Sequence, residues 1–327
     1  MQQLRFPIHD LHCDLLLYLA IIPKADINAT EDIGVTLPYL KEGGVRHQVA
    51  AIFARTDDQS VVWGEKQLTA YEELLDRPEF YGFTAVDQIT DTPAGIGLTL
   101  AIENASVLVL EDEPIQKAFD RLNHILDRSG RLFYITMTHH TENRFGGGNY
   151  SNAGLKADGE QLLDFMAERQ IPIDLSHTSD QLAEGILTYL EKQNLHIPVI
   201  ASHSNFRVLR NHPRNLTNEM VQEIVHRKGL IGANFLRLFL DGSDAESLLK
   251  HIIHGLEHAP ECIAFGADFF YRPAISAPER QPLFFTEYED AGQYPKILRQ
   301  LSEAGIDEHA LQSLAYGNVQ RFIRDNW

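Results

Sequence analysis

Apolar residues recur along the chain in eight short runs, and six of these runs carry or end at a side chain that can bind a metal or transfer a proton. Each run has the length and composition of a buried strand. In a parallel barrel the carboxyl ends of all strands lie on one face, where barrel enzymes place their chemistry. The runs cover residues 8–14, 45–54, 98–102, 133–138, 171–176, 199–202, 230–235 and 263–267.

The segments between these runs place apolar residues three or four positions apart, as amphipathic helices do. Strands alternating with helices predict a parallel sheet with right-handed crossovers. The polar residues converge from the first strand to the last, which favours a closed (β/α)8 TIM barrel over an open sheet. We expect residues 1–327 to form one such domain, although the length also suits two. The predicted helices cover residues 67–75, 115–126, 159–168, 179–192, 218–227, 245–258 and 293–304.

The chain is acidic, with 28 Lys and Arg against 46 Asp and Glu, a formal net charge of −18. Such a surface disfavours nucleic acids and anionic membranes as partners. The first residues, 1–7, have no apolar signal core, and no segment approaches the roughly 18–20 apolar residues that cross a membrane. Cys13 and Cys262 are too few for a disulfide framework and are expected to be small core residues. These features predict a cytoplasmic protein.

Two loops are expected at the barrel mouth. The stretch from Phe145 to Tyr150 contains three consecutive glycines. It lacks the Lys-Ser/Thr ending of a phosphate-binding loop, so a mobile loop at the active site is the preferred interpretation. The loop 269–285 contains three prolines and is expected to form part of the wall over the site.

Five polar residues on the strand ends form a candidate metal centre: His12, Asp14, Glu103, His177 and His203. Side chains two apart on a strand share a face, so the first two can reach one ion. Imidazoles and carboxylates suit zinc and related divalent metals, but one catalytic zinc usually takes only three protein ligands. Two Zn²⁺ ions therefore explain the set better. One would take His12 and Asp14, the other would take His177 and His203, and Glu103 would bridge them.

Each of these residues also has a purely structural interpretation. A histidine at a strand end is usually a hydrogen-bonded core or surface residue, Glu103 is in a position to cap a helix, and Asp14 is in a position to close a turn. Their shared strand-end position favours the metal centre. His9, His124 and His140 lack this agreement and are predicted to be structural.

Three further residues are candidates for catalysis or substrate binding. Asp268 has no place in the five-residue set and is predicted to accept and pass on a proton. His139 is predicted to donate a hydrogen bond to a developing oxyanion. Arg214 suits a carboxylate clamp, but a surface arginine paired with Glu219 explains it equally well. Together these residues predict a binuclear metal hydrolase.

In this order along the chain, the motifs resemble the membrane (renal) dipeptidase family of zinc metallopeptidases. The resemblance covers most of the chain. The motifs that carry it are His12-Cys13-Asp14, Ala101-Ile102-Glu103, Ile135-Thr136-Met137-Thr138-His139, Ile173-Asp174-Leu175-Ser176-His177, Ala201-Ser202-His203-Ser204, Arg214-Asn215, Phe265-Gly266-Ala267-Asp268-Phe269 and Gly317-Asn318-Val319-Gln320-Arg321.

The resemblance implies the same two zinc sites with Glu103 bridging, and a water shared by the two metals as the attacking group. It implies that His139 faces the tetrahedral centre of the substrate and that Arg214 holds the C-terminal carboxylate. Asp268 would handle the proton. It also implies a homodimer that cleaves dipeptides, including those with a D-residue at the C-terminal position.

The chain departs from the family pattern at two places next to this centre. Asn104-Ala105-Ser106 stands where the family usually has glycines, and Phe270-Tyr271-Arg272 replaces an acidic turn containing glycine. The stretch from Glu103 to His139 is also longer than in the animal enzymes. These changes leave the preferred dipeptide open.

Two other functions fit the same residues. One is another amidohydrolase-type reaction, such as removal of the acyl group from an N-acyl amino acid or opening of a lactone. The other is a catalytically inert metal-binding scaffold, which would need neither Asp268 nor His139.

Overall fold

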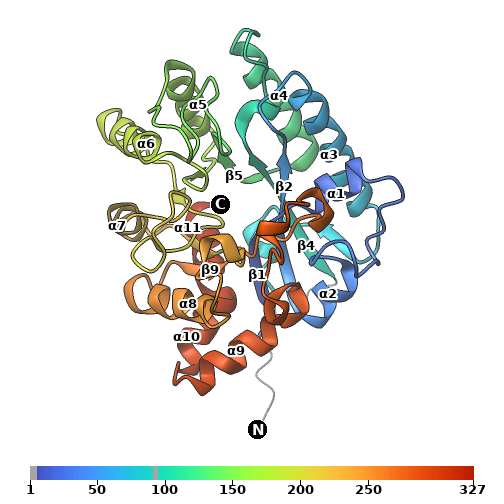
Figure 1. Ribbon diagram of the computed structural model, residues 1–327. Helices are drawn as coiled ribbons and strands as arrows, with labels where there is room; N and C mark the ends of the chain where they lie inside the picture. Colours follow the sequence, from blue (N-terminus) through green and yellow to red (C-terminus); the bar gives the residue numbers. More distant parts are fainter. Residues whose placement is uncertain (1–5, 91–94) are drawn as a thin grey trace.

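Eight parallel strands form a barrel in the computed structural model, which describes residues 6–90 and 95–327 (Figure 1). The strand order is β7-β6-β5-β4-β2-β1-β9-β8, and β3 pairs with the first part of β4. Backbone hydrogen bonds around a single bridge between Ala201 and Ile231 join β7 to β8. The strands are β1 (Ile8–Cys13), β2 (Val45–Phe53), β3 (Phe80–Gly82), β4 (Ile96–Glu103), β5 (Leu132–Thr136), β6 (Ile173–Asp174), β7 (Val199–Ile200), β8 (Ile231–Ala233) and β9 (Ile263–Phe265).

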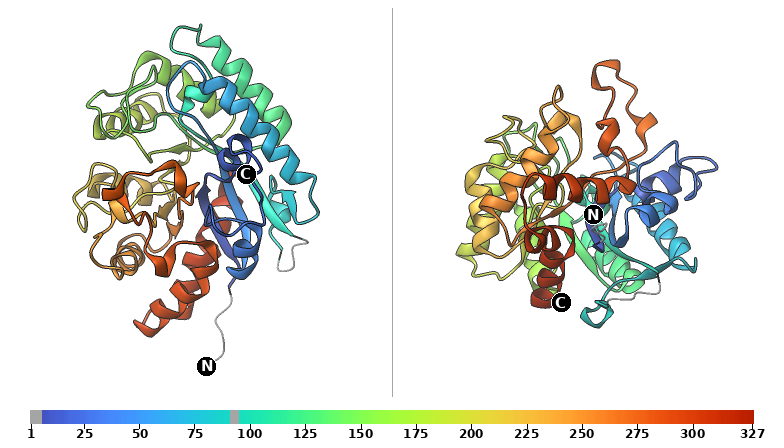
Figure 2. Two further views of the ribbon diagram at one scale, coloured as in Figure 1. Left: turned by 45° about the vertical axis from the view of Figure 1, so that its right-hand side comes forward. Right: turned by 90° about the horizontal axis from the view of Figure 1, so that it is seen from below.

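Helices surround this ring of strands (Figure 1). The longest two, α3 and α4, run side by side (Figure 2), and Arg128 of α4 pairs with Glu65 and Glu72 of α3. The helices are α1 (Leu15–Ile21), α2 (Leu37–Glu42), α3 (Ser60–Leu75), α4 (Gln116–Ser129), α5 (Ala157–Glu168), α6 (Asp180–Lys192), α7 (Asn218–His226), α8 (Ser247–His258), α9 (Tyr294–Glu303), α10 (Glu308–Gln312) and α11 (Asn318–Asn326).

The predicted barrel is confirmed, because each of the eight apolar runs overlaps one of its strands. Strands β6 to β9 are only two or three residues long, shorter than the runs. Side chains replace part of the strand pairing there. The carboxylate of Asp174, for example, accepts backbone N–H bonds from Ser176 and Ser202.

All seven predicted helices are present, with α3 starting seven residues before the predicted Gln67. Two of these helices begin at a side-chain cap: the hydroxyl of Ser179 accepts from Leu182 N, and that of Thr217 accepts from Met220 N. The pattern missed α1, α2, α10 and α11. These helices have five to nine residues, too few to establish an apolar period.

Apolar side chains fill the barrel below the mouth, and α11 closes its lower end. Val49 of β2 and Phe133 of β5 belong to this interior cluster together with Phe322 of α11. The rings of Phe133 and Phe322 stack with centroids 5.8 Å apart. The filled interior leaves the carboxyl ends of the strands as the place where polar side chains gather.

Cys13 and Cys262 are unpaired and buried, as predicted. No helix in the two described ranges is long and apolar enough to cross a membrane. The prediction of no signal core concerns residues 1–7, of which residues 1–5 lie outside the described part of the chain.

Candidate metal centre

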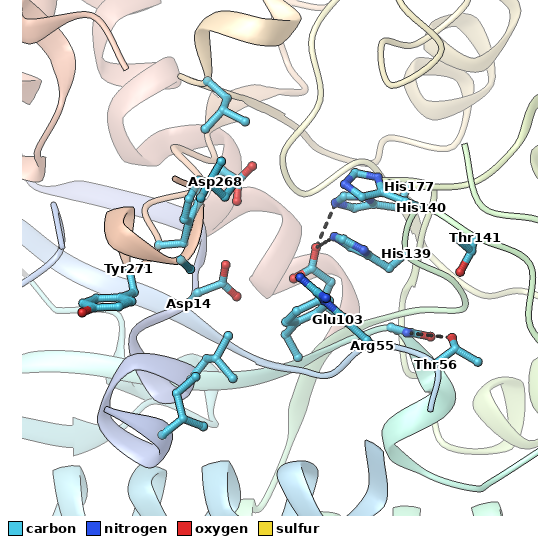
Figure 3. Close-up of a pocket in the computed structure, with 18 of the residues that line it drawn as sticks. Asp14, Arg55, Thr56, Glu103, His139, His140, Thr141, His177, Asp268 and Tyr271 are labelled. Carbon is cyan, nitrogen blue, oxygen red and sulfur yellow. Dashed lines mark hydrogen bonds and ion pairs between the residues drawn. The ribbon is translucent and has the colours of Figure 1, made fainter. Parts of the chain in front are cut away.

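The five predicted ligands meet at the carboxyl ends of the strands. Figure 3 shows three of them, with Glu103 between Asp14 and His177. Glu103 Oε2 lies 3.6 Å from His12 Nε2. Its other oxygen, Oε1, lies 2.9 Å from His177 Nε2 and 3.4 Å from His203 Nε2. Ligand atoms of His12, Asp14 and Glu103 all lie within 4.8 Å of one another, as do those of Glu103, His177 and His203. The two groups share only Glu103.

An irregularity in β1 turns His12 toward the mouth of the barrel. Asp10 pairs with Gln48 of β2, but Cys13 pairs with Ala50, so β1 has one extra residue. Leu11 therefore faces the interior core, and the next residue, His12, also faces inward. The carboxylate of Asp10 accepts the backbone N–H of His12, which holds the irregular segment.

Hydrogen bonds to the second ring nitrogen orient two of the histidines. His12 Nδ1 lies 2.6 Å from the hydroxyl of Tyr134, and His203 Nδ1 lies 2.6 Å from the hydroxyl of Ser202. Ser202 in turn donates to Asp174. Such partners fix a ligand histidine and leave its other nitrogen free for the metal.

The residues that follow three strands have left-handed backbone conformations. The φ angles are 71° at Asn104, 64° at His177 and 65° at Asp268. Residues other than glycine are uncommon there and cluster at functional sites. Asparagine adopts this region more readily than most residues. Asn104 therefore takes the left-handed conformation at a position where the membrane dipeptidase-like sequences usually have glycine. Its side chain also donates to the carbonyl of Ala54.

Burial keeps the three histidines neutral, as metal ligands must be, and makes the two carboxylates difficult to ionise without a cation beside them. It lowers the pKa of His12 to about 3 and holds the pKa values of His177 and His203 well below their usual range, so the imidazoles are neutral. Burial and the charge of Asp268 raise the pKa of Asp14, and burial with both neighbouring carboxylates raises that of Glu103. Neutral imidazoles and crowded buried carboxylates both favour a bound divalent cation.

A structural role does not account for Asp14 or for the free nitrogen of His12. Asp14 precedes α1, but its side chain makes no capping hydrogen bond. Its Oδ1 and the Nε2 of His12 are buried polar atoms with no hydrogen-bond partner in the described part of the chain. Unpartnered buried polar atoms are costly. Both atoms point into the group of ligands, so the donor set fits a metal.

Asp268 and His139, the predicted catalytic residues, lie at the edge of the same centre. Asp268 Oδ1 is 3.7 Å from His12 Nε2, and Asn234 Nδ2 donates to its Oδ2 at 2.8 Å. Burial raises the pKa of Asp268 to about 7. His139 Nε2 is 3.9 Å from Glu103 Oε1, and its side chain is 24% exposed. Both residues line the cavity above the ligands.

His140 was missed by the sequence prediction, which treated it as structural. It lines the same cavity, and its ring lies 5.0 Å from that of His177. His140 Nδ1 is 3.0 Å from Asn149 Oδ1, at the end of the glycine-rich stretch. No other signal marks it in the sequence, because it is one residue beyond the strand-end position. By contrast, His9 is buried against His47, and His124 is exposed on α4, both away from the centre.

The glycine-rich stretch packs closely against neighbouring backbone, and its mobility stays a prediction. A Cβ on Gly147 would lie 2.3 Å from the carbonyl oxygen of Ala153, and one on Gly148 would lie 2.1 Å from that of His139. Gly147 also accepts the backbone N–H of Ser179. The glycines are needed for close backbone approach, which places Asn149 beside His140.

Arg214 is buried and has no ion pair with Glu219 among the residues described, so it is not the surface arginine of the alternative interpretation. Its Nη1 donates to Ser204 at 2.7 Å and its Nη2 to the carbonyl of His203 at 2.9 Å. Its charge lies close enough to oppose the rise in the pKa of Glu103 and Asp268. The side chain is not part of the cavity lining, so its role as carboxylate clamp stays a prediction.

The cavity above the ligands has a volume of about 540 Å³. The loop 269–285 forms one wall, as predicted, through Phe270, Tyr271 and Ile275. Tyr271 stacks on Tyr18 with ring centroids 5.5 Å apart. Two arginines, Arg55 and Arg280, also line the cavity and were not predicted.

A sequence profile described as "Membrane dipeptidase (Peptidase family M19)" matches residues 2–326. The chain belongs to the membrane dipeptidase family. This confirms the resemblance, and the family and the converging donor groups together indicate a metal cofactor.

Curated relatives of this family member are distant. It is 27% identical over 191 residues to the "Uncharacterized protein in pqqA 5'region" of Klebsiella pneumoniae, and 26% identical over 201 residues to "Dipeptidase verJ" of Clonostachys rogersoniana. The matches cover 56% and 58% of this chain, and 65% and 47% of those relatives. The chain thus matches less than two thirds of the length of either relative.

A solved structure matches over almost the whole length. It is a metallo peptidase from Rhodobacter sphaeroides, liganded with a phosphinate mimic of the dipeptide L-Ala-D-Ala. The TM-score is 0.80 at 20% identity, with 98% of this chain and 99% of that chain covered. At this identity the likeness supports the barrel fold.

Proposed function

We propose that the protein is a dipeptidase that hydrolyses the peptide bond of dipeptides at a pair of zinc ions. The observation that carries the proposal is the placement of Glu103. Its two carboxylate oxygens face two separate groups of ligand atoms, as a carboxylate that bridges two metals would. In this proposal His12 and Asp14 hold one ion, and His177 and His203 hold the other.

Bound at this centre, two divalent cations would supply an activated water and polarise the scissile carbonyl. Asp268 would take a proton from the attacking water and deliver it to the leaving amine. Its buried carboxylate, fixed by Asn234, is in a position to do so. His139 would donate a hydrogen bond to the developing oxyanion from the wall of the cavity.

Arg214 would hold the α-carboxylate of the substrate, which would explain a preference for dipeptides over longer peptides. To reach it, the guanidinium would exchange its hydrogen bond with Ser204 for one with the substrate. Arginine binds carboxylates through two parallel hydrogen bonds, and the Nε of Arg214 has no partner among the described residues. Substrates with a C-terminal D-residue are included, since the Rhodobacter sphaeroides structure holds a mimic of L-Ala-D-Ala.

The test of this function combines metal analysis with a substrate panel. We expect about two zinc ions per chain and hydrolysis of L,L and L,D dipeptides. Chelation should abolish this activity, and zinc should restore it. N-acyl amino acids and lactones serve as the comparison substrates. Faster turnover of either class would assign another amidohydrolase-type reaction, and a zinc-loaded protein inert toward the whole panel would be a scaffold.

We also propose that residues 1–327 form a single domain, that the protein is a homodimer, and that it acts in the cytoplasm. The continuous ring of strands from β1 to β9 supports the first point. Light scattering should give twice the mass of the 37.0 kDa chain, and calorimetry should show one unfolding transition. A monomeric mass or two separate transitions would contradict these proposals.

A further inference from the structure

We propose that the cavity selects dipeptides with an acidic side chain, and that Arg55 and Arg280 bind the side-chain carboxylate. This inference rests on the proposed dipeptidase function and deepens it. The two arginines come from distant parts of the chain, Arg55 from the segment after β2 and Arg280 from the loop 269–285. Both line the cavity above the ligand residues.

Arg55 has no ion pair or hydrogen bond to its guanidinium within the described residues, although the chain is rich in acidic groups. Its side chain lies in the cavity beside His139 (Figure 3). Both side chains belong to the lining of the cavity. An arginine that turns into a cavity rather than toward an acidic neighbour is available to an anionic ligand.

Arg280 is partly buried and equally without a carboxylate partner in the described ranges. Its Nε is shielded from solvent and has no hydrogen-bond acceptor. Arg280 and Arg55 line the same cavity as His139 and His140, whose rings are 3.9 Å apart.

The carboxylates of the metal centre do not serve as charge partners of Arg55 and Arg280. The positive charge that acts most on Glu103 and Asp268 is that of Arg214, which is bound to Ser204 and His203. Two guanidinium groups that line one cavity, neither of them paired with a carboxylate of the described residues, form a receptor for a carboxylate separate from the one assigned to Arg214.

The experiment compares acidic substrates with neutral substrates of the same shape. The zinc-loaded full chain is assayed with Ala-Glu against Ala-Gln and with Glu-Ala against Gln-Ala. We expect kcat/KM to favour the acidic member of at least one pair by about 10-fold or more, the scale of one charged hydrogen bond. Arg55→Gln and Arg280→Gln should each reduce this ratio about 10-fold.

Matched variants separate charge recognition from damage to the fold. Arg299→Gln removes an exposed arginine on α9 and should leave the ratio unchanged. Arg55→Lys and Arg280→Lys keep the positive charge and should retain part of the preference, which a merely structural role would not predict. Zinc content and circular dichroism verify that each variant is folded.

Three results would overturn the inference in distinguishable ways. Equal kcat/KM for acidic and neutral members in wild type would refute it while the dipeptidase function stands. An unchanged ratio in Arg55→Gln and Arg280→Gln would refute the assignment to these residues. Failure of the zinc-loaded wild type to cleave any dipeptide would refute the proposed function itself, and this inference with it.

Discussion

Replacing Glu103 with glutamine is expected to lower kcat/KM for dipeptides by about 10³-fold or more and to leave fewer than two zinc ions per chain. One carboxylate faces both groups of ligands, with one oxygen toward His12 and the other toward His177 and His203. The amide removes a negative charge and one of the two oxygen donors. Loss of one preorganised electrostatic group alone costs 10²- to 10³-fold, and both metals are affected here. Steady-state kinetics with zinc analysis measures both effects.

Glu113→Gln is the matched control for this variant. Glu113 is a partly exposed glutamate paired with Arg121, away from the cavity. It should keep wild-type activity and zinc content. If Glu103→Gln retained two zinc ions and turnover near that of wild type, Glu103 would not be a bridging ligand.

Replacing Asp268 with asparagine is expected to reduce kcat by about 10²- to 10⁴-fold while zinc content stays nearly unchanged. This range is typical for loss of a general acid or base. Asp268 is buried and held by Asn234, and it is not one of the five proposed ligands, although its carboxylate lies within 4.8 Å of ligand atoms of His12 and His203. The asparagine keeps the size of the side chain but cannot accept or return the proton. The measurement is kcat together with zinc per chain.

The two readouts separate proton transfer from metal binding. Loss of turnover together with loss of zinc would make Asp268 a ligand, which its approach to His12 and His203 would then explain. Turnover equal to that of wild type would remove Asp268 from the mechanism.

The sequence predicts the barrel well because its signal is repeated eight times. Every apolar run became a strand, and the polar residues that six of the runs carry all lie on the one face formed by the carboxyl ends of the strands. The five ligands came together for the same reason. The alternation of side chains along a strand does not by itself predict the direction of His12. The extra residue in β1 turns its side chain inward, and no residue type in the sequence marks that irregularity.

The walls of the cavity were harder to predict, since loops carry no periodic signal. His140, Arg55 and Arg280 are set by the paths of loops after the strands, and each position alone looks like an ordinary surface residue. The glycine-rich stretch was interpreted as a mobile loop because it follows a strand at the barrel mouth, where active-site loops lie. The structure uses the same glycines for contacts that no Cβ would allow.

The departures from the family pattern have different consequences. Asn104 takes the left-handed conformation itself and hydrogen-bonds to Ala54, so it preserves the turn after Glu103. Phe270 and Tyr271 contribute their side chains to the cavity wall. Arg272 instead pairs with Glu289 and anchors the loop. Substrate preference, rather than the metal centre, is where this chain is expected to differ from its relatives.

Anomalous X-ray diffraction at the zinc edge, on crystals of the zinc-loaded protein, tests the central claim most directly. We predict two peaks on either side of the Glu103 carboxylate, one beside His12 and Asp14 and the other beside His177 and His203. A single peak, or peaks away from these five side chains, would contradict the account.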